Sequence, residues 1–169
     1  EQGVTGRTYL YCDLPKAASM IARALEESLG VIKGQPVDPR PIGAKLWKYF
    51  CLAGPAGVIG MALSAVDAVC WDALAAAADT SLCRFLGGQP SAVPAYNSNG
   101  LGLMPAEAAA DDAEGLLDGG FRAVKLRLGH ADFADDLAAV RAVRKRLPGD
   151  VELMADYNQA LSVDEALER

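Results

Sequence analysis

Histidine is nearly absent from this chain of 169 residues, which has a single His at position 130. Catalysis by a Ser-His-Asp or Cys-His pair needs an imidazole beside the nucleophile, so neither is expected within these residues. The four cysteines lack the C-x-x-C spacing of a redox or metal site. They are expected to be reduced thiols in a cytoplasmic protein.

A long uncharged apolar run is also missing. The Ala-rich stretch at residues 57–78 comes closest, but Asp67 and Asp72 interrupt it, so no transmembrane helix is expected. The N-terminus has no basic segment followed by an apolar one, so no signal peptide is expected. The net charge is −6, and the one basic cluster, at residues 141–146, ends an expected helix, where cations favour the helix dipole. Nucleic acid is therefore not an expected partner.

The first half of the chain predicts one strand followed by helices. Residues 6–12 alternate in the manner of a strand. Helices are predicted over residues 16–29, 44–50 and 56–78, and apolar residues recur every three or four positions in the last of these. The glycines and the proline of the segment Gly87-Gly88-Gln89-Pro90 break regular secondary structure, and we expect a domain boundary there.

Strands and helices alternate after residue 90. The predicted strands span residues 93–97, 121–128 and 151–156. The predicted helices lie at residues 105–119 and 132–147, and a third begins at Ser162, which forms a capping-box pattern with Glu165. This alternation implies parallel strands joined by right-handed crossovers, an arrangement found both in barrels and in open sheets.

Polar side chains occur near the C-terminal ends of the last two predicted strands. Lys125 and Arg127 share one face of an otherwise apolar strand, because residues two apart in a strand point the same way. Asp156 and Asn158 share one face of the next strand. If the strands are parallel neighbours, two cations, a carboxylate and an amide converge at the ends where α/β barrels place their chemistry.

These four residues also have structural interpretations. Asp156 would cap the turn after its strand, and Asn158 would be a turn residue. Arg127 would form a salt bridge to a carboxylate such as Asp156. Lys125 would be a surface residue of an edge strand. It is nevertheless a stronger functional candidate, because a buried face would not tolerate two cations without anions or solvent.

Other polar residues are expected to be structural. We expect His130 in a surface loop. Tyr96 is expected in the core, with a position lining the pocket as the alternative. Asp67 and Asp72, inside the long helix, are expected to form hydrogen bonds or ion pairs.

Several of these segments resemble the enolase superfamily, and specifically its mandelate racemase branch. The resemblance is carried by Ala65-Val66-Asp67 with Trp71-Asp72-Ala73-Leu74, by Gly120-Phe121-Arg122-Ala123-Val124-Lys125, and by Ala155-Asp156-Tyr157-Asn158-Gln159. It implies a partial α+β capping domain at residues 1–88, followed by the first β/α units of a modified TIM barrel at residues 89–169. By this resemblance the chain is expected to be truncated at both ends.

The resemblance also implies a reaction, which is abstraction of the proton α to a carboxylate with Mg²⁺ stabilising the enediolate. Asp156 matches the first of three carboxylate metal ligands. Lys125 matches the first Lys of a Lys-x-Lys motif that contacts the substrate carboxylate. Asn158 and Ser98 match groups near the substrate. The other metal ligands are expected outside this chain, so the chain alone is expected to be inactive.

Arg127 departs from the family pattern, because it stands where the second Lys, a base for one face of the substrate, normally lies. A guanidinium has a pKa above about 12 and is a poor proton acceptor. This favours dehydration of an acid sugar or related hydroxy acid, with the base supplied by a His-Asp pair on later strands. Racemisation or epimerisation of a 2-hydroxy acid, or a non-catalytic truncated homologue, are the alternatives. The expected partners are a small carboxylate substrate and, at full length, further copies of the chain, with no nucleic acid or membrane.

Overall fold

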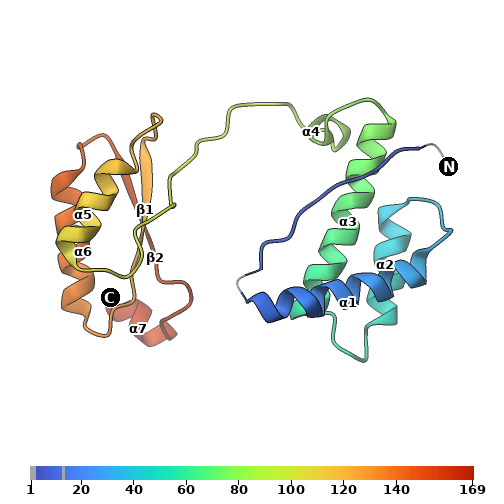
Figure 1. Ribbon diagram of the computed structural model, residues 1–169, viewed down its shortest axis with the longest axis horizontal. Coiled ribbons are helices and arrows are strands. Elements are labelled where there is room, and N and C mark those ends of the chain that lie inside the picture. Colours follow the sequence, from blue (N-terminus) through green and yellow to red (C-terminus); the bar gives the residue numbers. More distant parts are fainter. Residues whose placement is uncertain (1–2, 13) are drawn as a thin grey trace. The chain divides into compact units, whose positions relative to one another are not determined.

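The computed structural model describes residues 3–12 and 14–169, and it divides the chain into two compact units, Glu1–Ser91 and Ala92–Arg169. The division falls just after the Gly87–Pro90 segment, where the periodicity of the sequence changes. Figure 1 shows the elements of each unit.

The first unit is built from helices. They are α1 (Pro15–Ile32), α2 (Pro39–Tyr49), α3 (Gly57–Ala77) and α4 (Leu82–Phe85). A proline occupies the first turn of both α1 and α2, where its missing N–H leaves no hydrogen bond unmade. The Asp38 side chain also caps α2 by accepting from the Arg40 N–H. The helix α1 continues through Gly30, and α2 begins five residues before the predicted position 44.

The core of the first unit lies where α2 and α3 meet. Its buried side chains are Ile42, Leu46, Phe50, Val66 and Cys70. By length and composition alone, α3 is apolar enough to cross a membrane. In the folded chain it packs against both α1 and α2, as the periodicity of a core helix predicts.

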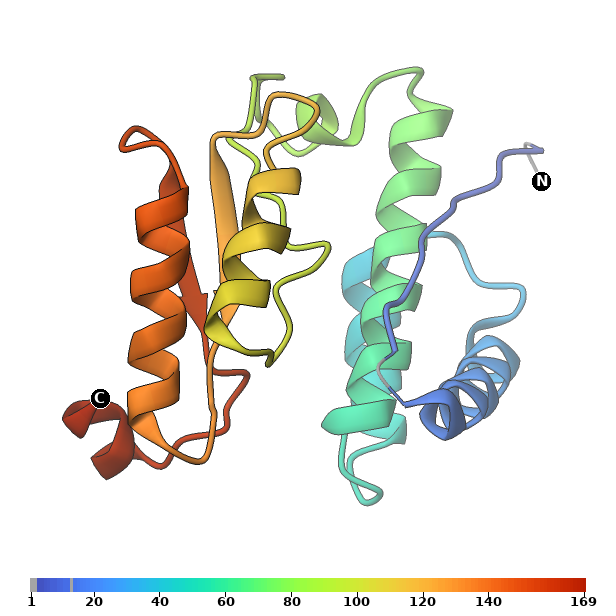
Figure 2. The same ribbon diagram turned by 60° about the vertical axis from the view of Figure 1, so that its left-hand side comes forward.

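The extended segment at residues 3–12 forms no strand with any residue that the structure describes. It runs along α3 (Figure 2), and Gly6 packs so closely that an added Cβ would lie 2.0 Å from the Val69 carbonyl oxygen. The Arg7 N–H donates to Asp72 Oδ2 at 2.7 Å, which gives Asp72 the structural role expected of it. The strand predicted at residues 6–12 is therefore wrong within this chain. Alternation specifies an extended conformation, but a strand also needs a hydrogen-bonding neighbour.

The second unit contains a parallel pair of strands with helices. Its elements are α5 (Ala106–Gly115), β1 (Ala123–Arg127), α6 (Phe133–Arg146), β2 (Glu152–Asp156) and α7 (Val163–Glu168). The capping box predicted at Ser162 and Glu165 is present in full at the start of α7. The strand predicted at residues 93–97 is reduced to one parallel bridge between Asn97 and Val124.

That bridge places β1 between two neighbours. The Asn97 N–H donates to the Ala123 carbonyl at 2.8 Å, and the Lys125 N–H donates to the Asn97 carbonyl at 3.1 Å. The opposite edge of β1 pairs with β2, in a register that sets Lys125 beside Met154 and Arg127 beside Asp156. Because both pairings are parallel, the segment at residue 97, β1 and β2 all end at the same edge.

The core of the second unit lies between the strands and the helices α5 and α6. Val124, Leu126 and Leu128 are at most 5% exposed and pack with buried side chains of both helices. Because side chains alternate along a strand, Lys125 and Arg127 point to the other face. This alternation leaves the face away from the helices to polar residues.

Candidate functional site

The centre of the candidate site is an ion pair between the two strands. Lys125 Nζ lies 2.9 Å from Asp156 Oδ2, and each side chain is about one third exposed. The Asn158 backbone N–H donates to Asp156 Oδ1 at 2.8 Å. This hydrogen bond and the Lys125 ammonium lower the pKa of Asp156. The Asp156 carboxylate in turn raises the pKa of Lys125, so the ammonium stays protonated.

Arg127 joins the site through Asn158 rather than through Asp156. In the orientation that satisfies its neighbours, the Asn158 amide donates to Asp156 Oδ2 at 3.2 Å and accepts from Arg127 Nε at 2.7 Å. The salt bridge from Arg127 to Asp156 that the sequence suggested as an alternative is therefore replaced by an amide that links the two. Asn158 has a φ of +46°, a backbone conformation that Asn tolerates better than most residues.

Tyr96 also belongs to this site, where a core position was expected. Its side chain is 42% exposed, and Lys125 Nζ lies 5.1 Å from the centre of its ring. The Tyr96 phenol adds to the effect of Asp156 in raising the pKa of Lys125. The sequence contained one indication of this role. Tyr96 lies next to the end of the strand predicted at residues 93–97, and barrel folds place functional side chains at strand ends.

Ser98 lies in the exposed loop that follows Tyr96 and Asn97. Its side chain makes no hydrogen bond to another described residue. The loop itself is well fixed. The Asn99 N–H donates to Asn97 Oδ1 at 3.0 Å, and the Leu101 N–H donates to Asp112 Oδ2 at 2.7 Å. The structure thus brings Lys125, Arg127, Asp156 and Asn158 together, and among the described residues no hydrogen bond joins the Ser98 side chain to them.

His130 lies in the loop after β1, as predicted, but its side chain is largely buried and has a partner. Its Nδ1 lies 2.8 Å from Oδ1 of Asp136, a carboxylate only 1% exposed. This contact could not be predicted from the sequence, because Asp136 lies in the acidic first turn of α6, where a solvated carboxylate is common.

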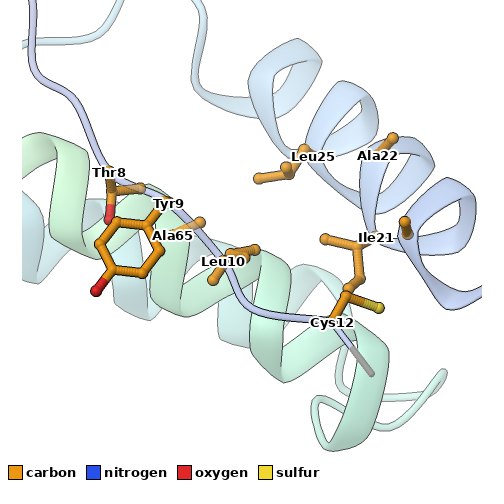
Figure 3. Close-up of a pocket in the computed structure, with 9 residues that line it drawn as sticks. Thr8, Tyr9, Leu10, Cys12, Ile21, Ala22, Leu25 and Ala65 are labelled. Carbon is orange, nitrogen blue, oxygen red and sulfur yellow. The ribbon is translucent and has the colours of Figure 1, made fainter. Parts of the chain in front are cut away.

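A separate apolar pocket of about 260 Å³ lies in the first unit, between the extended segment, α1 and α3 (Figure 3). Its lining residues are Thr8, Tyr9, Leu10, Cys12, Ala18, Ile21, Ala22, Leu25 and Ala65. None of them is a carboxylate, so the pocket lacks the charged oxygens that hold a hard cation.

The described residues do not form a complete metal site. No group of three His, Cys, Asp or Glu side chains in the described part of the chain could hold an ion. Asp156 supplies one hard oxygen donor of the kind that Mg²⁺ prefers, and a magnesium site needs several such oxygens. What the site can do alone is receive an anion, because Lys125 and Arg127 present two cations beside the Asn158 amide.

Parallel strands that end in cations and a carboxylate are typical of enzymes built on β/α units. A family model for the enolase C-terminal domain-like fold matches residues 108–169. The chain is 32% identical to 3,6-anhydro-alpha-L-galactonate cycloisomerase of Streptomyces coelicolor, over 98% of this chain and 46% of that protein. It is 28% identical to L-talarate/galactarate dehydratase of Salmonella typhimurium, over 93% of this chain and 40% of that protein.

Solved structures of enolase-type proteins also match this chain. An enolase from alpha proteobacterium bal199 with bound Mg matches all of this chain with a TM-score of 0.92 and 42% identity, and the match covers 48% of that protein. An L-talarate dehydratase from Polaromonas, complexed with Mg and L-glucarate, has a TM-score of 0.82 at 32% identity, over 98% of this chain and 47% of that protein.

The chain belongs to the enolase superfamily, in its mandelate racemase and muconate lactonizing enzyme-like branch. The family predicted from the sequence is thereby confirmed. The chain spans about half the length of the relatives that it matches. Those relatives include dehydratases, cycloisomerases and an epimerase, so the predicted classes of reaction are found among them, together with cycloisomerisation, which the sequence did not indicate. The magnesium expected from the resemblance is bound in several neighbours.

Proposed function

We propose that the intact protein containing this chain abstracts the proton α to a carboxylate, and that its reaction is dehydration of an acid sugar or related hydroxy acid. The observation that carries this proposal is the pair Lys125–Asp156, with Arg127 beside it, at the C-terminal ends of two parallel strands. The dehydratases among the relatives, and the neighbour crystallised with Mg and L-glucarate, support the same reaction and substrate class.

Within this proposal, residues 1–88 are part of a capping domain and residues 89–169 are the start of a β/α barrel. The two compact units of the chain support this assignment. The protein acts in the cytoplasm as a homo-oligomer, on a small carboxylate and without nucleic acid or membrane as a partner.

Each site residue has a proposed role. Asp156 is one carboxylate ligand of Mg²⁺, and the other ligands come from outside these 169 residues. The metal, when bound, supplies positive charge for the enediolate. Lys125 and Arg127 bind the substrate carboxylate and developing negative charge. Asn158 and Ser98 contact the substrate.

The protonation of the two cations favours dehydration over racemisation. Asp156 holds Lys125 in its ammonium form, and the guanidinium of Arg127 is protonated at any physiological pH. Neither group accepts a proton in this arrangement, so the base that removes the α-proton comes from elsewhere, and the side of the substrate that faces Lys125 and Arg127 has no base from these two residues. Racemisation requires a base on each face of the α-carbon, although a neighbour bound to mandelic acid keeps it as the second candidate.

A metal-binding measurement tests the proposal. A protein extended to the length of its relatives should gain thermal stability with Mg²⁺, because a ligand at about 100 times its Kd contributes about 2.7 kcal/mol. The same protein should exchange the α-proton of L-glucarate with D₂O, which NMR detects. Asp156→Asn should abolish both effects, whereas Asp118→Asn, at an exposed position in the turn after α5, should change neither. The 169-residue chain alone should show no Mg²⁺ stabilisation. If the extended protein also shows none, the proposed function is wrong.

A further inference from the structure

One carboxylate is buried in the second unit and has no part in the proposed reaction. Asp136, in the first turn of α6, is 1% exposed. Its Oδ1 accepts from the backbone N–H groups of Gly129 and His130 at 3.0 Å each and faces His130 Nδ1 at 2.8 Å. Its Oδ2 accepts from Arg169 Nη1 at 2.7 Å. The carboxylate is therefore fully satisfied by groups from outside its own helix.

These partners come from the ends of both strands. Gly129 and His130 lie just past the end of β1, after Leu128. The φ of +122° at Gly129 is one that residues with a side chain rarely adopt. This turn lets two consecutive N–H groups converge on one oxygen, as in an anion-binding nest. The Arg169 guanidinium also donates to the His130 carbonyl at 3.2 Å and lies 6.0 Å from the centre of the Tyr157 ring, directly after β2. Asp136 thus ties both strand ends to α6 and α7.

The same strand ends carry the candidate site on their opposite side. Tyr157 packs against the buried core of the second unit. Its neighbours Asp156 and Asn158 bond to each other, and the Asn158 amide accepts from Arg127. Leu128, between Arg127 and Gly129, donates to the Asp156 carbonyl at 2.9 Å. A shift of either strand end would therefore separate Arg127 from Asn158.

We propose that Asp136 is a positioning residue, which holds the ends of β1 and β2 so that Arg127 meets the Asn158 amide. Asp136 touches neither the substrate nor the reacting atoms. The proposal rests on the proposed function only in taking Arg127, Asp156 and Asn158 as site residues. A buried ion cluster is weak evidence for any function by itself, so the test must separate positioning from plain stabilisation.

The test uses the full 169-residue chain without metal or substrate. The probe is the NMR signal of the Arg127 Nε–H, assigned by its loss in Arg127→Lys. In Asp136→Asn, Oδ1 remains an acceptor but the ion pair with Arg169 is lost, and opening at the strand ends should rise roughly tenfold or more. We expect the Arg127 Nε–H signal to shift and its exchange with solvent to quicken by a similar factor. The matched control is Asp135→Asn, the same charge change on the adjacent exposed residue of α6.

A second variant covers the case in which Asp136→Asn does not fold. Arg169→Gln removes one partner of the cluster and leaves the backbone bonds to Asp136 in place, so it should move the Arg127 signal in the same direction by less. If either folded variant is less stable but leaves the Arg127 signal at the parent position, Asp136 is only structural and the proposal is overturned. That result would leave the proposed function standing, since the Mg²⁺ test above does not involve Asp136. Conversely, absence of Mg²⁺ stabilisation with a shifted Arg127 signal would overturn the function and keep the positioning role.

Discussion

Lys125 Nζ lies 2.9 Å from Asp156 Oδ2, although the strand register sets Arg127, not Lys125, directly beside Asp156. The contact is diagonal because the longer reach of Arg127 takes its guanidinium past Asp156 to the Asn158 amide. One carboxylate is thereby shared between an ammonium and an amide, and the guanidinium is held one step further from it. The two cations lie on a single face of β1, so this face can bind an anionic group.

The ion pair predicts how Asp156 titrates. Lys125→Met removes the cation that lowers the pKa of Asp156, so this pKa should rise toward its ordinary value, while the Asn158 N–H keeps part of the effect. A depressed pKa in the folded state means that ionised Asp156 stabilises the fold above the unfolded pKa and that this stabilisation is lost as the pH falls. The carbon-13 signal of the Asp156 carboxyl followed against pH measures the change. Lys145→Met, at an exposed position of α6, is the control, and an equal shift in both variants would contradict the role of the pair.

The identity of residue 127 predicts whether the α-proton of the substrate can be removed from one face of the α-carbon or from both. In a protein of full length, Arg127→Lys would replace a group with a pKa above about 12 by an amine that can lose its proton. Beside the Lys125 ammonium, the pKa of the new amine should be lowered. We expect a gain of α-proton exchange from the face that carries residue 127, seen as deuterium incorporated from D₂O into the opposite enantiomer of a 2-hydroxy acid. Arg122→Lys, in the exposed pair with Asp150, should show no gain. If the parent protein already exchanges the α-proton from the face that carries residue 127, Arg127 does not limit proton removal to one face.

Much of the second unit could be predicted, because local patterns determine it. The alternation in residues 121–128 gave β1, with Lys125 and Arg127 turned away from the buried Val124 and Leu126. The order of strands and helices gave the parallel pairing. Those two features are enough to bring Lys125 and Asp156 into one site.

The features that were missed depend on distant partners. Residues 6–12 have the alternation of a strand, but pairing depends on a second segment that no local pattern reveals. Asp136 looks like an ordinary acidic residue of a first helical turn, and only the fold shows that Gly129, His130 and Arg169 converge on it. For Tyr96 a core position was preferred over one lining the pocket, and its half-exposed ring lies beside Lys125.

Two glycines of the first unit predict opposite effects for the same substitution. In Gly6→Ala the new methyl would lie 2.0 Å from the Val69 carbonyl oxygen, and relief of such overlap typically costs about 1–3 kcal/mol. In Gly43→Ala, inside α2, the methyl would meet nothing within 4 Å, and alanine stabilises a helix over glycine by about 0.5–1 kcal/mol. Both tryptophans, Trp47 and Trp71, lie in this unit. Their fluorescence in urea therefore reports its unfolding. A Gly6→Ala chain as stable as the parent would show that the extended segment is not bound to α3.

The lowered pKa of the Asp136 carboxyl leads us to expect that the second unit loses stability in acid. Burial alone would raise the pKa of Asp136, but the hydrogen bonds from Gly129, from the backbone and ring of His130, and from Arg169 outweigh burial and lower it to about 2. Against an ordinary value of 3.8, this difference corresponds to about 2 kcal/mol of stabilisation. Because the folded pKa is the lower one, the stabilisation is complete above about pH 4 and is lost as the pH falls toward about 2.

Asp136→Asn should therefore lower the stability of the second unit near neutral pH and make it less sensitive to acid. The free energy of unfolding, measured in urea at about pH 2.5, 4 and 6 from the methyl signals of Val124 and Val143, should fall less steeply below about pH 4 in the variant than in the parent. Asp135→Asn should keep the acid sensitivity of the parent, because Asp135 is exposed and outside the cluster. If Asp136→Asn and the parent lose stability in parallel between about pH 4 and 2.5, other carboxylates are responsible for the acid response. The hydrogen bonds to Asp136 would then contribute far less than its burial among four donors implies.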